Sequence, residues 1–359
     1  MKNRRWIVSR AAGAAFGAPA ILRFGSLLAP AGVATRSFAQ TKPPSWLSPD
    51  LLAKAKAEGG TITVYSSVNE QEALPLWKDF EEPTGIKVEY VRASDTALVG
   101  RIALEARAQQ RSWDVLVTTA VGRLPQDFLV PFEPAQAKDY PKQAFGPGGR
   151  WYGVYSNNCA PSYNTKHIDP AKLPKTYEEF ASRKEWAGRV AIDVHDEQWL
   201  IGQFRHHGEA KARKTLGDIA DNLKPTLVDG HLALARQVGL GEYWVTVSNY
   251  INLTNNVRMR GSPTDFWVID PLVVIYGAVG ISARAPRPNT ARLAAEFLMS
   301  REGQQKLTHA GRIPVRQDVT PNPPDVWKRL EGHKLVPVNL TGDQEKKATA
   351  DFNSIFRKR

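Results

Sequence analysis

Small polar residues follow three segments that are typical of buried strands in the first third of this 359-residue sequence. The strands are expected at Thr61–Tyr65, Ile86–Val91 and Trp113–Val117. The polar residues that follow them are Ser66, Ser67 and Asn69, then Ser94 and Thr96, then Thr118 and Thr119. Such side chains, with the free N–H groups of a following helix, can hold a carboxylate, a phosphate or another oxyanion. Simple capping of helix N-termini would also explain them, and both interpretations stay open.

Three further candidates lie in the second half of the chain. Asp196 and Trp199 follow a strand expected at Arg189–Ile192, and His231 stands directly after Gly230 and ahead of a predicted helix. A Trp at a cleft offers a flat apolar face and an indole donor, while packing inside the fold is its alternative role. His195, Asp196 and Glu197 are metal-ligand types, but three consecutive residues do not easily share one coordination sphere. We therefore predict no metal site there.

The elements that must position these residues alternate between strand and helix. A helix is expected at Pro49–Glu58, ahead of the three strands of the first paragraph, and two more at Glu70–Glu81 and Ala97–Gln109, between those strands. This order predicts a parallel α/β unit with right-handed crossovers. A second α/β portion follows the Gly146–Gly149 loop, with a strand at Tyr243–Val247. Strand signals return at Val268–Ile281, and one amphipathic helix is expected over Asn289–Thr308. The fold class is therefore α/β.

The net charge of +12 is concentrated at the N-terminus. Six of the 48 basic residues and none of the 36 acidic residues lie in residues 1–40, so the remainder carries only +6. No basic run interrupts that remainder. This distribution argues against a nucleic-acid partner and favours, weakly, an anionic small ligand.

The N-terminus has the features of a signal peptide, residues 1–39. A basic start is followed by two apolar stretches, Ala11–Leu22 and Phe24–Thr35, and cleavage is expected after Ala39. Arg23 divides the apolar residues into pieces shorter than the roughly 20 that a membrane span needs. The Arg4-Arg5 pair resembles a twin-arginine signal, although Asn3 stands where that signal has Ser or Thr. The twin-arginine and the general secretory routes stay open.

Catalytic motifs are absent from the sequence. It has no Gly-x-Ser-x-Gly elbow, no His-Glu-x-x-His and no phosphate-binding Gly-x-x-x-x-Gly-Lys-Ser/Thr loop. Cys159 is the single cysteine, so the chain has no intramolecular disulfide, and a buried packing role is expected for it. We predict that the protein is not an enzyme and carries no cofactor.

Several segments, in their order and spacing, resemble the bacterial extracellular solute-binding proteins of ABC transporters, in particular the branch of iron(III) receptors. The resemblance spans about residues 60–316 and is carried by Thr63–Ala73, Thr84–Tyr90, Asp114–Leu116, Trp186–Ile192, Asp196–Trp199, Gly230-His231, Gly241-Glu242 and Phe297–Gln304. It implies the type II periplasmic-binding-protein fold, two α/β lobes that are hinged by crossing strands and close on a ligand. Lobe 1 would comprise residues 40–153 and 270–320, lobe 2 residues 154–269, and residues 321–359 a C-terminal tail.

The resemblance also places ligand contacts at Asn249 and Tyr250. Members that hold ferric iron use two adjacent tyrosines there, whereas this sequence has Asn249 before Tyr250. The positions of the iron-binding His and Glu of those members align with Asn69 and Thr119. These departures from an anionic oxygen-ligand set favour an organic or phosphorylated anion over iron, with Tyr250 as the first candidate ligand if iron binds.

The resemblance therefore implies a periplasmic substrate-binding protein of an ABC importer, with ferric iron or an iron chelate as the alternative ligand. Its expected partners are a small, anionic solute and the inner-membrane permease with its ATPase. We expect a monomer that acts in the periplasm after cleavage near Ala39.

Overall fold

The computed structural model describes residues 44–357. The predicted signal peptide and its cleavage position therefore lie outside the described residues. Within residues 44–357, no helix has the length and apolar character needed to cross a membrane.

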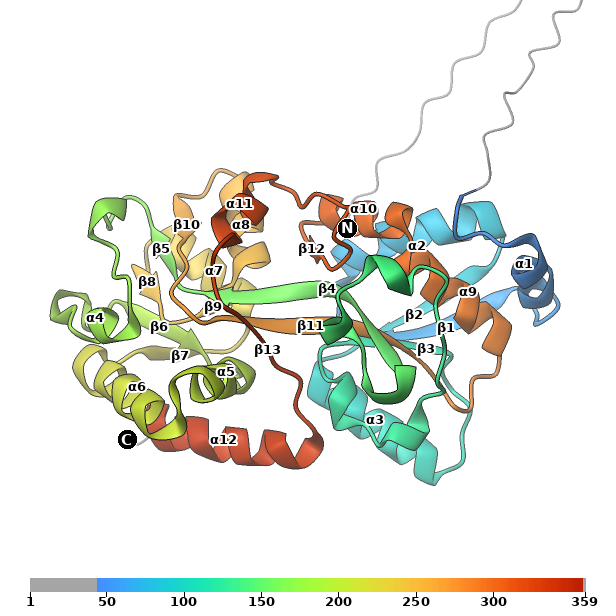
Figure 1. Cartoon of the computed structure of the whole chain (residues 1–359), viewed down its shortest axis with the longest axis horizontal. Coiled ribbons are helices and arrows are strands. Elements are labelled where there is room, and N and C mark those ends of the chain that lie inside the picture. The colour runs from blue at the N-terminus through green and yellow to red at the C-terminus, as the bar shows by residue number, and fades with distance from the viewer. Residues whose placement is uncertain (1–43, 358–359) are drawn as a thin grey trace, which may run out of the picture. The chain divides into compact units, whose positions relative to one another are not determined.

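The first of two sheets contains eight strands (Figure 1). Its parallel part consists of β1 (Thr61–Ser66), β2 (Lys87–Arg92) and β3 (Val115–Thr118), joined by α2 (Glu70–Thr84) and α3 (Asp95–Arg107). The predicted parallel strand–helix unit is thus confirmed. The other members are β4 (Trp151–Ala160), β9 (Asn249–Tyr250), β11 (Leu272–Ile281), β12 (Ile313–Pro314) and β13 (Leu335–Pro337). β11 lies antiparallel between β3 and β4.

The side chains of a strand alternate between the two faces of its sheet. Those of β1 accordingly pack into a different apolar cluster on each face. Ile62 and Val64 of β1 belong to one apolar cluster, which also contains side chains of α2 and α9 (Pro288–Met299). Tyr65 of the same strand belongs to a second cluster with Leu98 and Ile102 of α3. The carboxyl ends of β1, β2 and β3 therefore remain as the edge where polar side chains can gather.

The second sheet contains five strands in the order β10-β5-β8-β6-β7. They are β5 (Ser162–Asn164), β6 (Val190–Asp193), β7 (Thr226–Val228), β8 (Val245–Thr246) and β10 (Thr264–Phe266). The helices of this part are α4 (Tyr177–Ala181), α5 (Glu197–His207), α6 (Glu209–Leu223), α7 (His231–Leu240) and α8 (Ile251–Met259). β6 pairs in parallel with both β7 and β8, which again creates an edge of strand carboxyl ends.

Two long paired strands connect the sheets. β4 leads directly into β5, and β10 precedes β11, so the chain enters and leaves the second sheet through the β4–β11 pair. We call the part built on the first sheet lobe 1 and the part built on the second sheet lobe 2. β4 runs without a break through the expected boundary at residues 153 and 154, so the boundary residues stay a prediction.

The expected C-terminal tail contains folded elements. Residues 321–357 form α11 (Asp325–Leu330), β13 and α12 (Gly342–Phe356), and β13 pairs with β11. α12 lies along α5 and α6 (Figure 1) and buries Ala348, Phe352 and Ile355 in the apolar core of lobe 2. These apolar residues recur on one face of a helix whose other positions are charged.

The helix expected over Asn289–Thr308 is two helices, α9 and α10 (Arg301–His309). Ser300 interrupts them with extended backbone, and its Oγ accepts a hydrogen bond from the N–H of Gly303 at 2.9 Å. A side chain at position 303 would collide with the carbonyl of Phe297, so Gly303 permits the sharp turn. The apolar pattern continues across this break, which is why it predicts a single helix.

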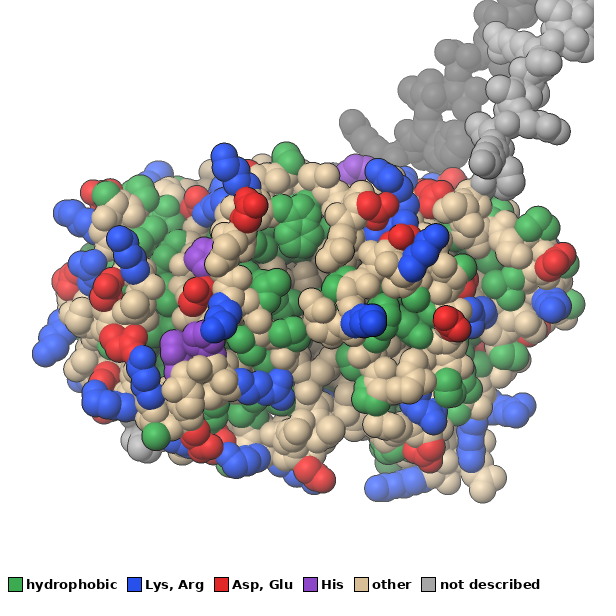
Figure 2. All heavy atoms as spheres, in the orientation of Figure 1, with side chains coloured by type: hydrophobic (Ala, Val, Ile, Leu, Met, Phe, Trp, Pro, Cys, Tyr) green, Lys and Arg blue, Asp and Glu red, His purple; other side chains and the backbone are tan. Residues whose placement is uncertain are grey.

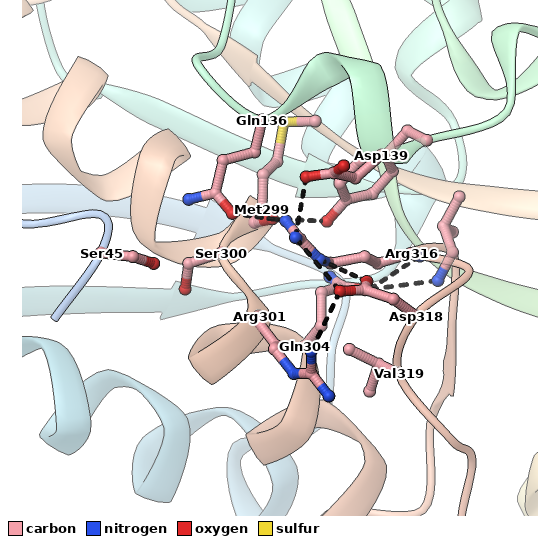
Figure 3. A network of polar contacts seen from close by, with 12 residues as sticks. Ser45, Gln136, Asp139, Met299, Ser300, Arg301, Gln304, Arg316, Asp318 and Val319 are labelled. Carbon is pink, nitrogen blue, oxygen red and sulfur yellow. Dashed lines mark hydrogen bonds and ion pairs between the residues drawn. The ribbon is translucent and has the colours of Figure 1, made fainter.

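α1 (Pro49–Lys56) packs against α9 on lobe 1, and a buried arginine fixes the chain that follows β12 to the same lobe (Figure 3). The Arg316 side chain is 7% exposed and pairs with Asp318 at 2.6 Å and with Asp139 at 2.8 Å. It also donates to the Gln136 side chain. A buried guanidinium needs such partners because an unpaired buried charge is costly.

Candidate functional site

Four of the predicted site residues meet where lobe 2 adjoins β9 of the first sheet. His231 begins α7, Asp196 precedes α5, and Asn249 and Tyr250 form β9. His231 Nδ1 lies 3.2 Å from Asn249 Oδ1, and His231 Nε2 lies 3.8 Å from Asp196 Oδ1. The His231 and Tyr250 rings stack with their centroids 3.6 Å apart. The sequence prediction that these residues share a site is therefore consistent with their placement, although ligand contact itself stays a prediction.

Several polar atoms of this group are buried without a hydrogen-bond partner. They are Asp193 Oδ2, Asp196 Oδ2, His231 Nε2 and Asn249 Nδ2. Asp193, Asp196 and Asn249 are each no more than 1% exposed. Buried polar groups in folded proteins are normally paired, so a concentration of orphaned donors and acceptors is unusual. These unpaired atoms are positions at which the polar groups of a small molecule can form hydrogen bonds.

Burial changes the protonation of these groups. It raises the pKa of Asp196 well above its usual range, and the charges of Asp193 and Glu197 add to that effect. Burial lowers the pKa of His231, against the opposing effect of Asp193. Burial also raises the pKa of Tyr250 well above its usual range. Neutral forms of Asp196, His231 and Tyr250 are therefore favoured.

Lobe 1 contributes a second polar group at the ends of β3 and the start of α3. The Thr118 and Thr119 hydroxyls both donate to the Asp95 carboxylate. Arg123, in the short helix η1 (Val121–Arg123), donates to Thr96 Oγ1 at 3.5 Å. The charge of Asp95 contributes to the raised pKa of Tyr250, after burial and the nearer carboxylates of lobe 2.

The remaining lobe 1 candidates lie at the next strand ends. Ser66 is 1% exposed, and its Oγ accepts from the Val68 N–H at 3.1 Å. Ser67 is half-buried beside it, and Asn69 stands at the N-cap position of α2 without capping it. Asn69 Oδ1 instead accepts from Arg92 at 3.5 Å. Ser94 caps α3 through its hydroxyl and is exposed, as the capping interpretation of the sequence expects.

Trp199 lies apart from this group. Its side chain is 0% exposed in the apolar core of lobe 2, and its indole N–H donates to Tyr177 Oη at 3.3 Å. The Tyr177 ring packs against it edge-on, with the centroids 5.6 Å apart. Of the two roles considered for Trp199, packing within the lobe accounts for these contacts.

Sequence reasoning missed four residues that the structure brings to the site: Asp95, Arg123, Asp193 and Glu345. Asp193 is the last residue of β6, so the rule of polar residues at strand ends could have found it. Asp95 stands between the chosen Ser94 and Thr96. Glu345 lies on α12, more than 80 residues beyond the other lobe 2 candidates, and no local pattern indicated it.

A large cavity lies on the other face of the β4–β11 pair. It has a volume of about 790 Å³ and is lined by Ser156 and Asn158 of β4, Val274 and Tyr276 of β11, and Trp327 of α11. Figure 2 shows hydrophobic side chains around a hollow beside α11. None of the predicted site residues lines this cavity. Among residues 44–357, no group of three or more His, Cys, Asp or Glu side chains is arranged to hold a metal ion.

Comparison with known proteins adds family information to this geometry. The sequence model of a family described as "Bacterial extracellular solute-binding protein" matches residues 76–334. A curated relative, the Fe(3+)-binding periplasmic protein of Serratia marcescens, is 29% identical over 147 residues. That match covers 39% of this chain and 41% of the relative, so the chain spans less than half of the relative's length in it.

Solved structures resemble almost the whole described chain. Iron-bound HitA from Pseudomonas aeruginosa matches with a TM-score of 0.67 at 19% identity, over 82% of this chain and 99% of that one. AfuA from Actinobacillus pleuropneumoniae, with fructose 6-phosphate bound, matches with a TM-score of 0.70 at 18% identity, over 84% and 100%. At these identities the likeness establishes the fold, and it confirms the predicted two-lobed α/β architecture.

Proposed function

This chain belongs to the bacterial extracellular solute-binding protein family, and we propose that it delivers a small hydroxylated solute with an anionic group to an ABC importer. The family and the structural neighbours are transport proteins and not enzymes. A sugar phosphate is the kind of solute that combines both features. The following contacts support this choice over the alternatives.

The observation that carries the proposal is the set of orphaned polar atoms on the lobe 2 wall. Asp193 Oδ2 is an acceptor and Asn249 Nδ2 is a donor, whereas the carboxyl group of Asp196 can accept and, when protonated, also donate. A hydroxyl group both donates and accepts, so neighbouring hydroxyls of one ligand can satisfy acceptors and donors together. A purely anionic ligand only accepts hydrogen bonds, so it would leave Asp193 Oδ2 without a donor. Hydroxyls therefore suit this wall better than a carboxylate or phosphate does.

The anionic group fits the strand ends of lobe 1. Ser67 and the uncapped start of α2 lie beside the exposed Arg92, which is the last residue of β2 and pairs in register with Ser66 of β1. A helix N-terminus and an arginine both favour a negative group. This orientation would direct the anion to lobe 1 and the hydroxyls to lobe 2.

Ferric iron, the alternative ligand, is less favoured by these contacts. Burial raises the pKa of Tyr250 well above its usual range, so forming a phenolate there requires a bound cation. Asn249, beside it, offers an amide and not a second phenol. The resemblance to iron-binding proteins keeps iron as the alternative that the experiment must test.

Export and partners complete the proposal. We propose cleavage after Ala39, so that the mature chain begins at Gln40 and acts in the periplasm as a monomer. There it would pass its solute to an inner-membrane permease and its ATPase. Intact mass and size-exclusion chromatography of the periplasmic protein test the cleavage site and the monomer directly.

The proposal is tested by native mass spectrometry of the periplasmic protein, followed by thermal shift with candidate solutes. The panel contains sugar phosphates, free sugars, dicarboxylates, polyamines and ferric citrate. A ligand at 100 times its Kd stabilises the folded state by about 2.7 kcal/mol, which gives a measurable rise in Tm. We expect the largest rise with a sugar phosphate, and a smaller one with the matching free sugar.

Other outcomes would redirect the assignment. A rise with ferric citrate alone, accompanied by a visible phenolate-to-iron absorption band, would favour the iron alternative. A rise with polyamines alone would show that the carboxylates recognise a cation, and would contradict the proposed anionic group.

A further inference from the structure

The C-terminal segment joins the two lobes beside the candidate site. α12 is fixed to lobe 2, because its apolar face lies in the core of that lobe. Its N-terminal end contacts η1 of lobe 1 (Figure 1). The backbones are close there, since a Cβ at Gly122 would lie 2.9 Å from the Leu340 carbonyl oxygen. Residues 339–341 and this part of lobe 1 together line a small cavity of about 130 Å³.

An ion pair reinforces this junction. Arg123 Nη2 lies 2.5 Å from Glu345 Oε1, and both side chains are only 16% exposed. Arg123 is thereby held between Thr96 of α3 and Glu345 of α12. The pair links the lobe 1 group that contains Thr118, Thr119 and Asp95 to a helix anchored on the other lobe.

The second carboxylate oxygen of Glu345 is not used by this ion pair. Glu345 Oε2 is buried without a hydrogen-bond partner, as are Asp193 Oδ2 and Asp196 Oδ2. Burial raises the pKa of Glu345, Arg123 opposes this, and the charges of Glu197 and Asp95 add to it. Arg123 belongs to lobe 1 and α12 packs in the core of lobe 2, so Glu345 lies where the lobes converge. The Thr349 hydroxyl, one turn further along α12, donates to Glu197 at 3.3 Å.

We propose that Glu345 is a solute-binding residue and that Arg123 is its positioning residue, so that the C-terminal helix forms a third wall of the site. Glu345 Oε2 accepts a hydrogen bond from a solute hydroxyl, while Oε1 stays on Arg123. The match to the family model ends at residue 334, before α12, so this wall lies outside the part of the chain that the family description covers. The solute class in this inference rests on the proposed function, whereas the ion pair between the lobes does not.

The test compares solute affinity in the mature protein and its variants by calorimetry, with fructose 6-phosphate and the other sugar phosphates of the panel as probes. Glu345→Gln is expected to weaken binding about tenfold or more, because it replaces a charged acceptor by a neutral amide. The matched control is Asp343→Asn on the same helix, whose side chain is 97% exposed. The solute affinity of Asp343→Asn should stay within about twofold of that of the wild type.

A charge reversal separates solute contact from a purely mechanical link between the lobes. Arg123→Glu and Glu345→Arg are each expected to lower the Tm of the ligand-free protein, and the double variant should recover it. Solute affinity should not recover in the double variant, because the hydroxyl acceptor is then lost. Arg123→Lys should keep part of the affinity, since it retains a cation beside Glu345.

Two results would overturn the inference, and they differ from failure of the proposed function. Wild-type affinity in Glu345→Gln would show that Oε2 does not touch the solute. Full recovery of affinity in the charge-reversed double variant would show that Glu345 acts only as a link between the lobes. A wild-type protein that binds no hydroxylated probe would instead refute the proposed function itself.

Discussion

Individual side chains at the site are polar, buried and incompletely paired, and Asp196 is the clearest case. Its carboxylate is 1% exposed, and its Oδ2 has no partner. An arrangement of this kind lowers the stability of the ligand-free protein, because a buried polar group without a hydrogen-bond partner is costly. Binding sites often carry such a cost. We therefore expect Asp196 to reduce stability while contributing to affinity.

Asp196→Asn tests this expectation. Burial raises the pKa of Asp196, so the folded state binds its proton more tightly than the unfolded state, where the pKa is about 4. The wild-type stability linked to this group is therefore greatest at low pH and falls as the pH rises from about 4 through the raised folded-state pKa. In Asp196→Asn, the free energy of unfolding should no longer fall over this pH range. The variant should unfold at a higher urea concentration than the wild type at neutral pH, and it should bind solute more weakly.

The control is Asp229→Asn, since the Asp229 side chain is 85% exposed beside the same site. It should leave both the pH profile of unfolding and the solute affinity nearly unchanged. A wild-type slope that persists in Asp196→Asn would mean that another group causes it.

Residue types at strand ends were sufficient to predict part of the site. His231, Asn249 and Tyr250 were found because a Gly-His motif and the family resemblance indicate them, and Thr118 and Thr119 because they follow a strand. Trp199 shows the limit, because one Trp at a strand-to-helix turn can face a cleft or the core. The choice depends on Tyr177 and the other aromatic side chains around it, which are distant in the sequence.

Secondary structure elements were predicted well where their pattern was local. β1, α2, β2 and α3 lie near their expected ranges, since β-branched runs and helical apolar spacing are short-range signals. The break between α9 and α10 was missed because Ser300 and Gly303 interrupt the backbone without interrupting the apolar spacing. Contacts between distant strands were also out of reach. The packing of the Tyr155 ring of β4 against Gly277 of β11 is an example.

Gly277→Ala tests that contact between the two strands. Gly277 lies on β11, where β4 brings Tyr155 so close that a Cβ would be 1.9 Å from Cζ of its ring. Tyr155 is 2% exposed beneath the Arg312 guanidinium, which also pairs with Glu72 at 2.5 Å. The ring therefore cannot move freely, and we expect a loss of about 1–3 kcal/mol or more in the free energy of unfolding.

Gly217→Ala is the matched control for this substitution. Gly217 lies inside α6 with no atom near the position of a new Cβ. Alanine favours helix over glycine by roughly 0.5–1 kcal/mol, so this variant should be slightly more stable than the wild type. Equal stability of the two variants in urea unfolding would contradict the proposed collision at Tyr155.

At the scale of the whole molecule, the sequence pattern and the family resemblance together predicted two lobes, but not the role of the last residues. The segment 321–359 was expected as a C-terminal tail. Its apolar residues in α12 become interpretable only when α5 and α6 offer a surface for them. That surface belongs to a part of the chain more than 100 residues away.

Removal of residues 342–359 is therefore expected to destabilise the protein. Phe352 is 0% exposed and Ile355 8% exposed in the core of lobe 2, and burial of each such side chain is worth roughly 1.5–3 kcal/mol. Thermal unfolding should show a lower Tm and increased binding of a hydrophobic dye. Removal of residues 358 and 359 alone is the control and should have no effect. An unchanged Tm in the longer truncation would contradict the packing described for α12.

Cys159 has a practical consequence for measuring how far apart the lobes lie. It is the single cysteine, it is 1% exposed on β4, and burial raises the pKa of its thiol, so its reactive thiolate is scarce in the native protein. Cysteines introduced at exposed positions, one on each lobe, should therefore accept spin or fluorescent labels while the native thiol stays unmodified. Label pairs for distance measurements between the lobes can thus be attached without first replacing Cys159 of β4.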